Sequence, residues 1–314
     1  MAKIAKRVAK ANEAFAGKSN ITVEDAVKLI KEQYSPGNLM FPRGAIIDGN
    51  LNEVQDIDLG ALDQVQEYVT HSWYKYGDEQ QGLHPYQGET IPNFDICGAK
   101  GTKTRIEAVD ESAKYSWVKS PRWKGHAMEV GPLARYVIGY VKGIPEFKDP
   151  TDMVLAKLGG VPVTALFSTL GRTAARGLEC SWAAHKLKDE FNKLVANIKA
   201  GDTATANMAN FEPSTWAKSA KGHGFVEKTR STMYHWIEIE DKKIKNYQCV
   251  VPTTWNASPR DPAGKIGAYE AALLDTPMHD PEQPLEILRT IHSFDPCLAC
   301  ATHVLDMEGN EVTS

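Results

Sequence analysis

The sequence lacks a long apolar run, and no stretch approaches the roughly 18 apolar residues that a membrane-spanning helix needs. The opening segment MAKIAKRVAKANEAFAGK contains basic side chains but not the apolar stretch of a secretory signal. Charge of one sign is not concentrated anywhere, because the net charge of -4 comes from intermixed acidic and basic residues. The sequence therefore predicts no direct membrane span and gives no electrostatic argument for nucleic acid as a partner.

Cysteine is also scarce. The five cysteines are scattered along the chain, and their odd number leaves at least one thiol unpaired. This pattern excludes a disulfide framework and indicates reduced thiols. Internal repeats and low-complexity linkers are absent too, and the 42% hydrophobic content is enough to build a large core in one or two domains.

The strongest helical pattern covers residues 163–200, where apolar side chains recur mostly at spacings of three and four. At 1.5 Å per residue, such a helix would be about 57 Å long. The same reasoning predicts two short amphipathic helices within residues 1–34 and further helices over residues 62–76, 132–142 and 284–292. The chain is therefore expected to be mainly α.

Small β hairpins are expected as well. From His235 to Val251 apolar residues alternate with a period of two, and residues 241–243 have the composition of a turn. A second, tight hairpin is predicted at Asp48 and Gly49, which lie between apolar flanks. Residues 77–131 are rich in glycine, proline and polar side chains, which predicts long ordered loops packed on other elements.

The end of the chain combines two cysteines and a histidine at steps of three, Cys297, Cys300 and His303, which would lie along one side of a helical turn. A thioredoxin-like redox pair should open a helix after a strand, whereas this pair follows a predicted helix. Haem of the c type is excluded because Ala301, not histidine, follows the second cysteine. A structural zinc site would need a fourth ligand, and no second CxxC exists. The local pattern leaves a metal site and a buried thiol pair as equal alternatives.

The longer string HSFDPCLACATHV resembles the C-terminal signature Asp-Pro-Cys-x-x-Cys-x-x-His of nickel-iron hydrogenase large subunits. KYSWVKSPRWKGHAMEVGPLAR and NYQCVVPTTWNASPRDPAGKIGAYEAALLDTP resemble the membrane-bound uptake group of that family. The resemblance implies an incomplete long-helix bundle of the large-subunit type. It divides the chain into an N-terminal helical segment of unclear relation (1–37), a C-terminal part of the large subunit (38–303) and a cleavable extension (304–314).

The resemblance also implies metal ligands. Cys297 would be a terminal nickel ligand, and Cys300 would bridge nickel to an iron that carries cyanide and carbon monoxide, since thiolates are soft ligands that suit nickel. His303 would help to bind a magnesium or similar ion, with the main-chain carbonyl of Cys249 as a second ligand.

Three further positions match family residues around the metals. Arg230 would hold its guanidinium above the bimetallic centre with Asp295 as its carboxylate partner, and Thr253 would donate its hydroxyl and amide to the second cyanide. Without the resemblance, Arg230 and Asp295 would be read as an ordinary surface salt bridge. Thr253 would be read as a hydroxyl bonded to its own backbone.

Two departures from the family pattern matter. The family supplies two more thiolates from an Arg-x-Cys-Gly-x-Cys motif that this chain lacks, and Cys97 in Ile-Cys-Gly is not a substitute. The chain therefore resembles only the C-terminal half of a large subunit. In addition, Thr229 and Ser231 stand where proline and glycine are usual, which predicts a looser turn around Arg230.

Two functions follow. The first is the C-terminal, nickel-iron-binding part of a hydrogenase that catalyses reversible H2 oxidation, inactive as an isolated chain. Its partners would be an iron-sulfur small subunit, the missing N-terminal half and a maturation protease. The alternative is a non-catalytic truncated fragment that binds metal weakly through its CxxC. In both cases surface meant for partners should be exposed, including the aromatic residues Trp73, Tyr86 and Trp123.

The resemblance finally gives residues 304–314 a role. In the family a protease cuts just after the signature histidine once nickel is bound, so the chain would be an uncut precursor. Its location would be cytoplasmic in that form, and membrane-associated on the periplasmic side after maturation. An ordinary exposed C-terminus is the alternative.

Overall fold

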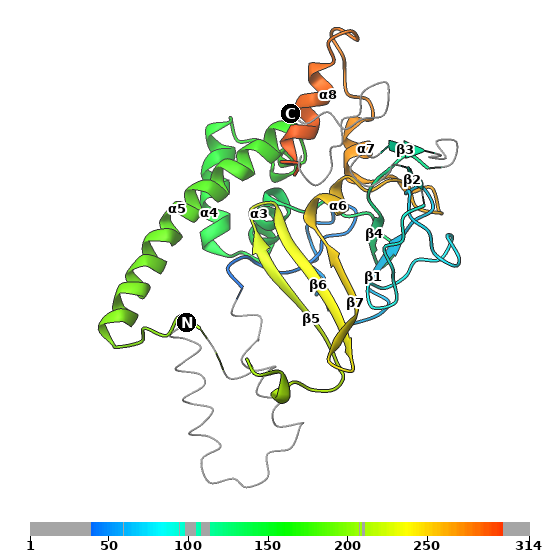
Figure 1. Ribbon diagram of the computed structural model, residues 1–314. Helices are drawn as coiled ribbons and strands as arrows, with labels where there is room; N and C mark the ends of the chain where they lie inside the picture. The colour runs from blue at the N-terminus through cyan, green and yellow to red at the C-terminus, as the bar shows by residue number, and fades with distance from the viewer. Residues whose placement is uncertain are drawn as a thin grey trace.

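The computed structural model describes residues 39–58, 60–93, 95–97, 105–107, 114–206, 208 and 211–297. Helices and three small sheets make up this part, with a three-stranded sheet between a group of helices and a loop-rich region (Figure 1). The predicted helices within residues 1–34 and the expected boundaries at residues 37 and 303 lie outside these residues and stay predictions. Among the described residues, no helix combines the length and apolar character needed to cross a membrane.

The largest sheet is antiparallel, with the order β5 (Ala220–Lys228), β6 (Ser231–Glu240) and β7 (Lys243–Val250). The hairpin predicted between residues 235 and 251 is confirmed as β6 and β7. Its turn residues Asp241 and Lys242 both have positive φ, as a two-residue hairpin turn requires. The strand β5 was not predicted, because its exposed, glycine-containing sequence AKGHGFVEK has no clear alternation.

Two smaller sheets lie in the loop-rich region. One pairs β1 (Val65–Tyr68) with β4 (Ser120–Trp123), and the other pairs β2 (Asp95–Cys97) with β3 (Arg105–Glu107). The helix predicted over residues 62–76 is therefore wrong. In β1, Val65 and Glu67 are buried while their neighbours are partly exposed, so the period is that of a strand packed on one face. The predicted turn at Asp48 and Gly49 is confirmed, because the Asn50 amide donates a hydrogen bond of 2.9 Å to the Ile47 carbonyl. The flanking residues form an isolated bridge between Ala45 and Gln55 and not the strands of a tight hairpin.

Three helices pack together on one side of the large sheet: α3 (Pro132–Val141), α4 (Pro145–Lys157) and α5 (Thr169–Lys199). Their shared core contains Leu133, Tyr136, Val137, Phe147, Leu155, Leu166, Ala175 and Trp182. The helix predicted over residues 132–142 is confirmed, whereas α4 was missed.

The long helix α5 begins later than expected. A short 3-10 helix, η2 (Val163–Leu166), precedes it. The side chain of Ser168 then caps α5 by accepting a hydrogen bond from the Gly171 amide. Its 31 residues correspond to about 46 Å instead of 57 Å. Within the described part of the chain α5 is the one long helix, so the expected bundle of several long helices is not confirmed.

Short elements complete the described part: η3 (Pro213–Thr215), α6 (Pro252–Asn256), α7 (Ala268–Leu273) and α8 (Leu285–Ser293). The helix predicted over residues 284–292 is confirmed as α8. A second core lies between the large sheet, β1, β4 and α6, and it consists of Ala45, Val65, Trp123, Trp236, Val250 and Trp255.

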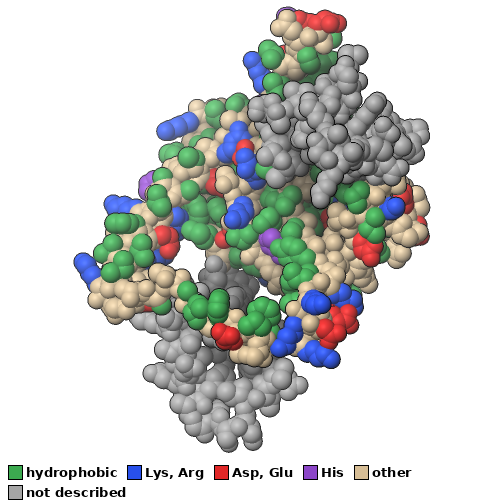
Figure 2. Space-filling view, in the orientation of Figure 1, with side chains coloured by type: hydrophobic (Ala, Val, Ile, Leu, Met, Phe, Trp, Pro, Cys, Tyr) green, Lys and Arg blue, Asp and Glu red, His purple; other side chains and the backbone are tan. Residues whose placement is uncertain are grey.

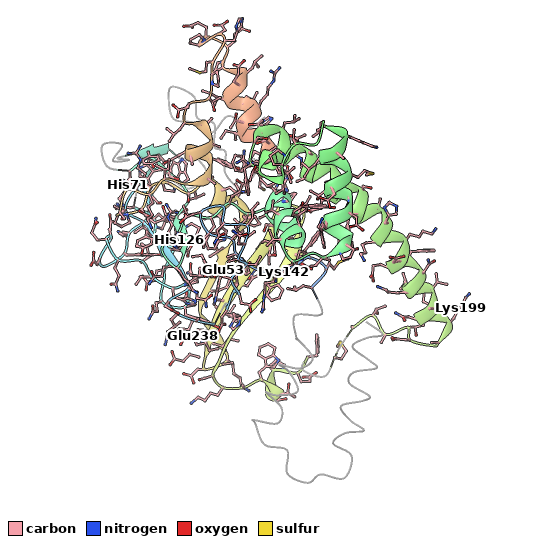
Figure 3. All side chains as sticks on the ribbon, turned by 180° about the vertical axis from the view of Figure 1, so that it is seen from behind. Glu53, His71, His126, Lys142, Lys199 and Glu238 are labelled. Atoms are coloured by element: carbon pink, nitrogen blue, oxygen red, sulfur yellow. The ribbon has the colours of Figure 1, made fainter. Side chains whose placement is uncertain are left out.

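Exposure of apolar side chains differs from the expectation. Trp73 and Trp123 are buried and Tyr86 is half-buried. Trp123 belongs to the second core and Tyr86 packs on it, whereas the ring of Trp73 packs on that of Trp117. The exposed apolar side chains lie instead along the outer half of α5, and Figure 2 shows hydrophobic side chains over this helix. Figure 3 shows Lys199 at the end of α5, far from the sheet.

Candidate metal centre

The chain leaves α8 just before the first predicted metal ligand. The helix ends at Ser293, and Asp295 has a φ of 57°, so the backbone turns away from the helix axis before Cys297. Cys297 therefore does not continue α8. Cys300 and His303 lie outside the described residues, and their predicted roles stay predictions.

Thr253 and Cys297 are brought together although they are 44 residues apart. Thr253 lies in the first turn of α6, where it is buried, and its Oγ1 accepts a hydrogen bond of 3.2 Å from the Cys297 amide. The hydroxyl therefore faces the cysteine segment and not only its own backbone. This contact fixes the position of the Cys297 main chain relative to α6.

Arg230 also contacts the cysteine segment. Its Nε donates a hydrogen bond of 2.9 Å to the main-chain oxygen of Asp295, and its Nη2 lies 3.5 Å from Asp295 Oδ1. The predicted partners are thus in contact. Both side chains are partly exposed, so the carboxylate contact by itself contributes little, and the bond to the main chain is the more specific one.

The turn that carries Arg230 was predicted to be loose from Thr229 and Ser231, and the structure describes its backbone as strained at Ser231. Lys228 and Ser231 pair across β5 and β6, so Thr229 and Arg230 form a two-residue loop. Ser231 has a φ of 137°, a value that favours glycine. A serine in this backbone conformation has an energetic cost.

Tyr269 of α7 is a site residue that the sequence analysis missed. Its ring packs on Phe294 with 4.9 Å between ring centroids, and its buried hydroxyl has no hydrogen-bond partner among the described residues. Burial raises the pKa of Tyr269 well above its usual range, and the nearby charge of Asp295 raises it further. A neutral phenol that lacks a partner would suit a polar group beside Cys297. No periodicity or motif in the sequence indicated it.

Cys249 lies on β7, opposite His235 of β6. Its exposed sulfur is 3.5 Å from His235 Nδ1, and this nitrogen is 2.6 Å from the Tyr247 hydroxyl. These contacts concern side chains, whereas the predicted magnesium ligand is the main-chain carbonyl. The magnesium role therefore stays a prediction.

No three histidine, cysteine, aspartate or glutamate side chains form a metal-binding cluster within the described ranges. Two of the predicted ligands, Cys300 and His303, fall outside those ranges. Of the three predicted side-chain ligands, the structure thus describes Cys297, with a hydroxyl and a guanidinium beside its segment.

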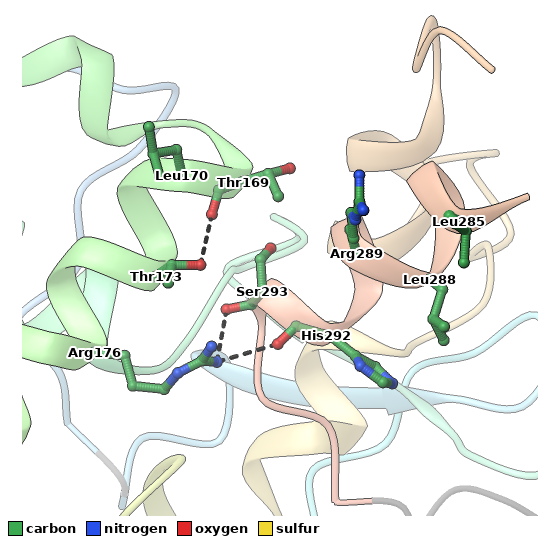
Figure 4. A pocket seen from close by; sticks show the side chains of 9 residues that line it. All are labelled: Thr169, Leu170, Thr173, Arg176, Leu285, Leu288, Arg289, His292 and Ser293. Carbon is green, nitrogen blue, oxygen red and sulfur yellow. Dashed lines mark hydrogen bonds between the residues drawn. The ribbon is translucent and has the colours of Figure 1, made fainter. Parts of the chain in front are cut away.

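A surface groove of about 490 Å³ lies between the start of α5 and α8 (Figure 4). It is lined by Thr169, Leu170, Thr173, Arg176, Leu285, Leu288, Arg289, His292 and Ser293. Arg230, Thr253 and Cys297 are not part of its lining. Arg176 donates hydrogen bonds of 3.1 Å to the carbonyls of His292 and Ser293, which fixes the end of α8 just before Asp295.

Residues 1–303 match the family described as nickel-dependent hydrogenase. The chain therefore belongs to the nickel-dependent hydrogenase family. The matched range ends at His303 and includes residues 1–37, which carry none of the motifs that resemble the family.

The similar proteins are large subunits. The chain is 63% identical over 280 residues to the uptake hydrogenase large subunit of Rhizobium leguminosarum bv. viciae, covering 89% of the chain and 47% of that protein. Identity to the corresponding subunit of Bradyrhizobium diazoefficiens is 62%, with the same coverage. The chain thus spans about half the length of these relatives, in agreement with the interpretation as a C-terminal half.

Solved structures agree with this assignment. The reduced Ni-Fe-Se hydrogenase from D. vulgaris Hildenborough has a TM-score of 0.64 and 30% identity, covering 86% of this chain and 50% of that one. The [NiFeSe]-hydrogenase of Dm. baculatum has a TM-score of 0.61 and 31% identity, with coverages of 84% and 48%. The arrangement of helices and small sheets is therefore that of hydrogenase large subunits.

Proposed function

We propose that the chain is the C-terminal, nickel-iron-binding part of a hydrogenase large subunit that takes part in the reversible oxidation of H2 to protons and electrons. The observation that carries this proposal is the convergence of α6, the β5–β6 turn and α7 on residues 294–297. Each supplies a side chain to the segment that begins the cysteine motif. Family membership supports the same conclusion.

Cys297 and Cys300 would hold the nickel-iron centre. Thiolates suit nickel, and the Thr253 hydroxyl, the Arg230 guanidinium and the unpartnered Tyr269 hydroxyl suit a polar, anionic group beside Cys297. When bound, this centre, with cyanide and carbon monoxide on its iron, would supply the place where H2 is split. His303 and the carbonyl of Cys249 would bind a magnesium or similar ion near it.

The chain's own residues would orient the groups bound at the centre and polarise them. Arg230 presents a permanent cation whose Nε is fixed on the Asp295 carbonyl, so charge that develops near it is stabilised without reorganisation. The Asp295 carboxylate, 3.5 Å from Nη2, directs the guanidinium plane. Thr253, which is buried, holds the Cys297 main chain and can donate its own hydroxyl proton to an anionic ligand.

The proposal needs partners. Relatives about twice as long support a missing half that supplies the Arg-x-Cys-Gly-x-Cys motif. An iron-sulfur small subunit would carry the electrons away, and a maturation protease would remove residues 304–314. The assembled enzyme would be membrane-associated on the periplasmic side, and the unprocessed chain cytoplasmic.

The first experiment measures nickel. Because two thiolates do not replace four, the isolated chain should retain little nickel after desalting and should show no hydrogen uptake or evolution. Adding a segment that carries the missing cysteine motif should raise nickel retention and give turnover. Stoichiometric nickel with turnover from the chain alone would contradict the claim that half of the ligand set is missing.

A non-catalytic fragment is the second candidate, and the exposed apolar side chains of α5 favour it. In that case the added segment would change neither nickel retention nor turnover, although the chain would still bind metal weakly through its CxxC. Nickel retention and turnover, measured with and without the added segment, therefore separate the two functions.

A second experiment separates catalyst from ligand in the reconstituted enzyme. Arg230→Lys keeps the charge but loses the planar fork, so metal content should stay near normal while turnover falls about a hundredfold, as for loss of one fixed electrostatic contact. Cys297→Ser should remove the nickel itself. Arg260→Lys, an exposed change in another loop, should alter neither quantity. Unchanged turnover in fully metallated Arg230→Lys would mean that Arg230 is only a salt-bridge partner of Asp295.

A further inference from the structure

The loop that carries Arg230 has little support from the sheet. It joins β5 to β6, and β5 is an edge strand whose side chains are mostly exposed. The strained Ser231 follows the loop directly, as the first residue of β6. A two-residue loop at the exposed edge of a sheet would move readily, so an accurate aim of Arg230 requires a contact from outside the sheet.

Arg135 of α3 makes that contact. Its Nη2 donates a hydrogen bond of 2.6 Å to the carbonyl of Lys228, the last residue of β5. A Cβ at Gly131, just before α3, would lie 3.5 Å from the Arg230 carbonyl, so the start of the helix also packs on the loop. In Figure 1 the loop lies beside α3 and below the end of α8.

Glu179 of α5 holds Arg135 in place. Its Oε1 accepts a hydrogen bond of 2.7 Å from Arg135 Nη1, and both side chains are buried. The guanidinium also lies 4.0 Å over the ring of Phe41. Because one planar fork contacts a carboxylate, a carbonyl and a ring, lysine could not replace it.

The same end of β5 is held from a second side. Glu227, next to Lys228, accepts hydrogen bonds from the amides of Met40 and Phe41 at 2.9 and 3.0 Å. The ring of Phe41 in turn lies 4.4 Å from that of Trp182 in α5. Elements α3, α5 and β5 are thereby joined with residues 40–41 around the buried hydrogen bond between Arg135 and Glu179.

We infer that Arg135 and Glu179 are positioning residues for Arg230: through the Lys228 carbonyl they fix the β5–β6 turn, and through Arg230 they fix the Asp295–Cys297 segment. The effect on hydrogen chemistry rests on the proposed function. The mechanical connection within the chain does not depend on that function. It runs from α5 to the cysteine motif in four contacts, of which the last is the bond from Arg230 Nε to the Asp295 carbonyl.

Amide hydrogen exchange at Asp295 and Cys297 in the full chain tests the connection and needs neither metal nor turnover. Arg135→Lys keeps the charge but cannot bond both Glu179 and the Lys228 carbonyl. We expect exchange at these two amides to become about tenfold faster, as for loss of a buried hydrogen bond to a charged group. Arg230→Lys, which loses the Nε donor, should have a similar effect.

A double variant tests whether the effects of the Arg135 and Arg230 changes are coupled or independent. If Arg135 acts through Arg230, Arg135→Lys combined with Arg230→Lys should exchange no faster than Arg230→Lys alone. Arg122→Lys is the matched control, because Arg122 is an equally buried arginine bonded to Asp261 and to the Pro259 carbonyl. It should lower stability without accelerating exchange at Asp295 and Cys297 selectively.

Glu179→Gln keeps the experiment decisive if Arg135→Lys does not fold. It retains an acceptor for Arg135 but loses the charge, so a smaller acceleration at the same two amides is expected. Additive effects of the Arg135 and Arg230 changes, or an acceleration no larger than that of Arg122→Lys, would overturn the proposal. Because the readout is exchange in the metal-free chain, failure of the hydrogenase function would leave it unaffected.

Discussion

At the scale of single residues, Ser231 has a backbone conformation that favours glycine. Ser231→Gly should remove the strain of a φ of 137° and raise the free energy of unfolding by about 1 kcal/mol, after the extra entropy of the unfolded chain is subtracted. Urea denaturation, read as a shift of the midpoint at constant slope, measures this change.

The control for this change is Ser219→Gly, just before β5 at a position without positive φ. There glycine only adds entropy to the unfolded chain, so stability should fall slightly. If both substitutions lowered stability, Ser231 would not be strained in the folded chain.

Glu179 gives a prediction about pH. Burial raises the pKa of Glu179 from 4.5 to about 7, although Arg135 opposes the shift. Between these values the folded carboxyl keeps its proton while the unfolded one has lost it, so the free energy of unfolding should fall as pH rises from about 4.5 to 7. Below pH 4.5 and above about pH 7, Glu179 causes no further change of the free energy of unfolding with pH.

Denaturation at pH 5 and pH 8 checks this prediction. Glu179→Gln cannot titrate, so its loss of stability between the two pH values should be smaller than that of the original chain. Asp189→Asn removes an exposed carboxyl from the same helix and should behave like the original chain. Equal pH dependence in all three chains would mean that Glu179 is ionised throughout.

At the scale of elements, the start of α5 depends on a single side chain. Ser168 accepts a hydrogen bond of 3.0 Å from the Gly171 amide, so Ser168→Ala should lower the free energy of unfolding by about 1 kcal/mol. Ser181→Ala, at an exposed position inside the same helix, should leave stability unchanged or raise it slightly, because alanine is the better helix former. Thermal unfolding followed by circular dichroism compares them, and an equal effect of both changes would exclude the cap.

At the scale of the whole molecule, the outer half of α5 exposes Leu187, Phe191, Leu194 and Ile198, whose exposed fractions are 72, 62, 55 and 53%. Their spacing of three and four places them on one face of the helix. Replacing the first three by glutamine should reduce the binding of a hydrophobic dye and the light scattering of the chain, with little change in the thermal midpoint.

The matched control replaces polar residues of the same helix, Lys188→Gln with Asp189→Asn. Dye binding should then stay as it was. If the apolar replacements lowered the thermal midpoint by many degrees and left dye binding unchanged, this face would be covered within the chain itself.

Local structure was largely determined by the sequence itself. The helices over 132–142 and 284–292 and the hairpin of β6 and β7 follow from periodicity and turn residues, because their hydrogen bonds join near neighbours. The motif around Cys297 was likewise sufficient to indicate the family. The resemblance of other stretches also indicated Arg230 and Thr253. In the structure Arg230 contacts Asp295, and Thr253 contacts Cys297.

Only the tertiary structure decided what lies across from each segment. Residues 65–68 form a strand because β4, more than 50 residues later, pairs with them, and Trp123 is buried because the sheet and α6 cover it. Arg135 and Tyr269 gain their importance from contacts with Lys228 and Phe294. Burial and ion pairing depend on groups that are remote in sequence, so periodicity, which reports only near neighbours, could not indicate them.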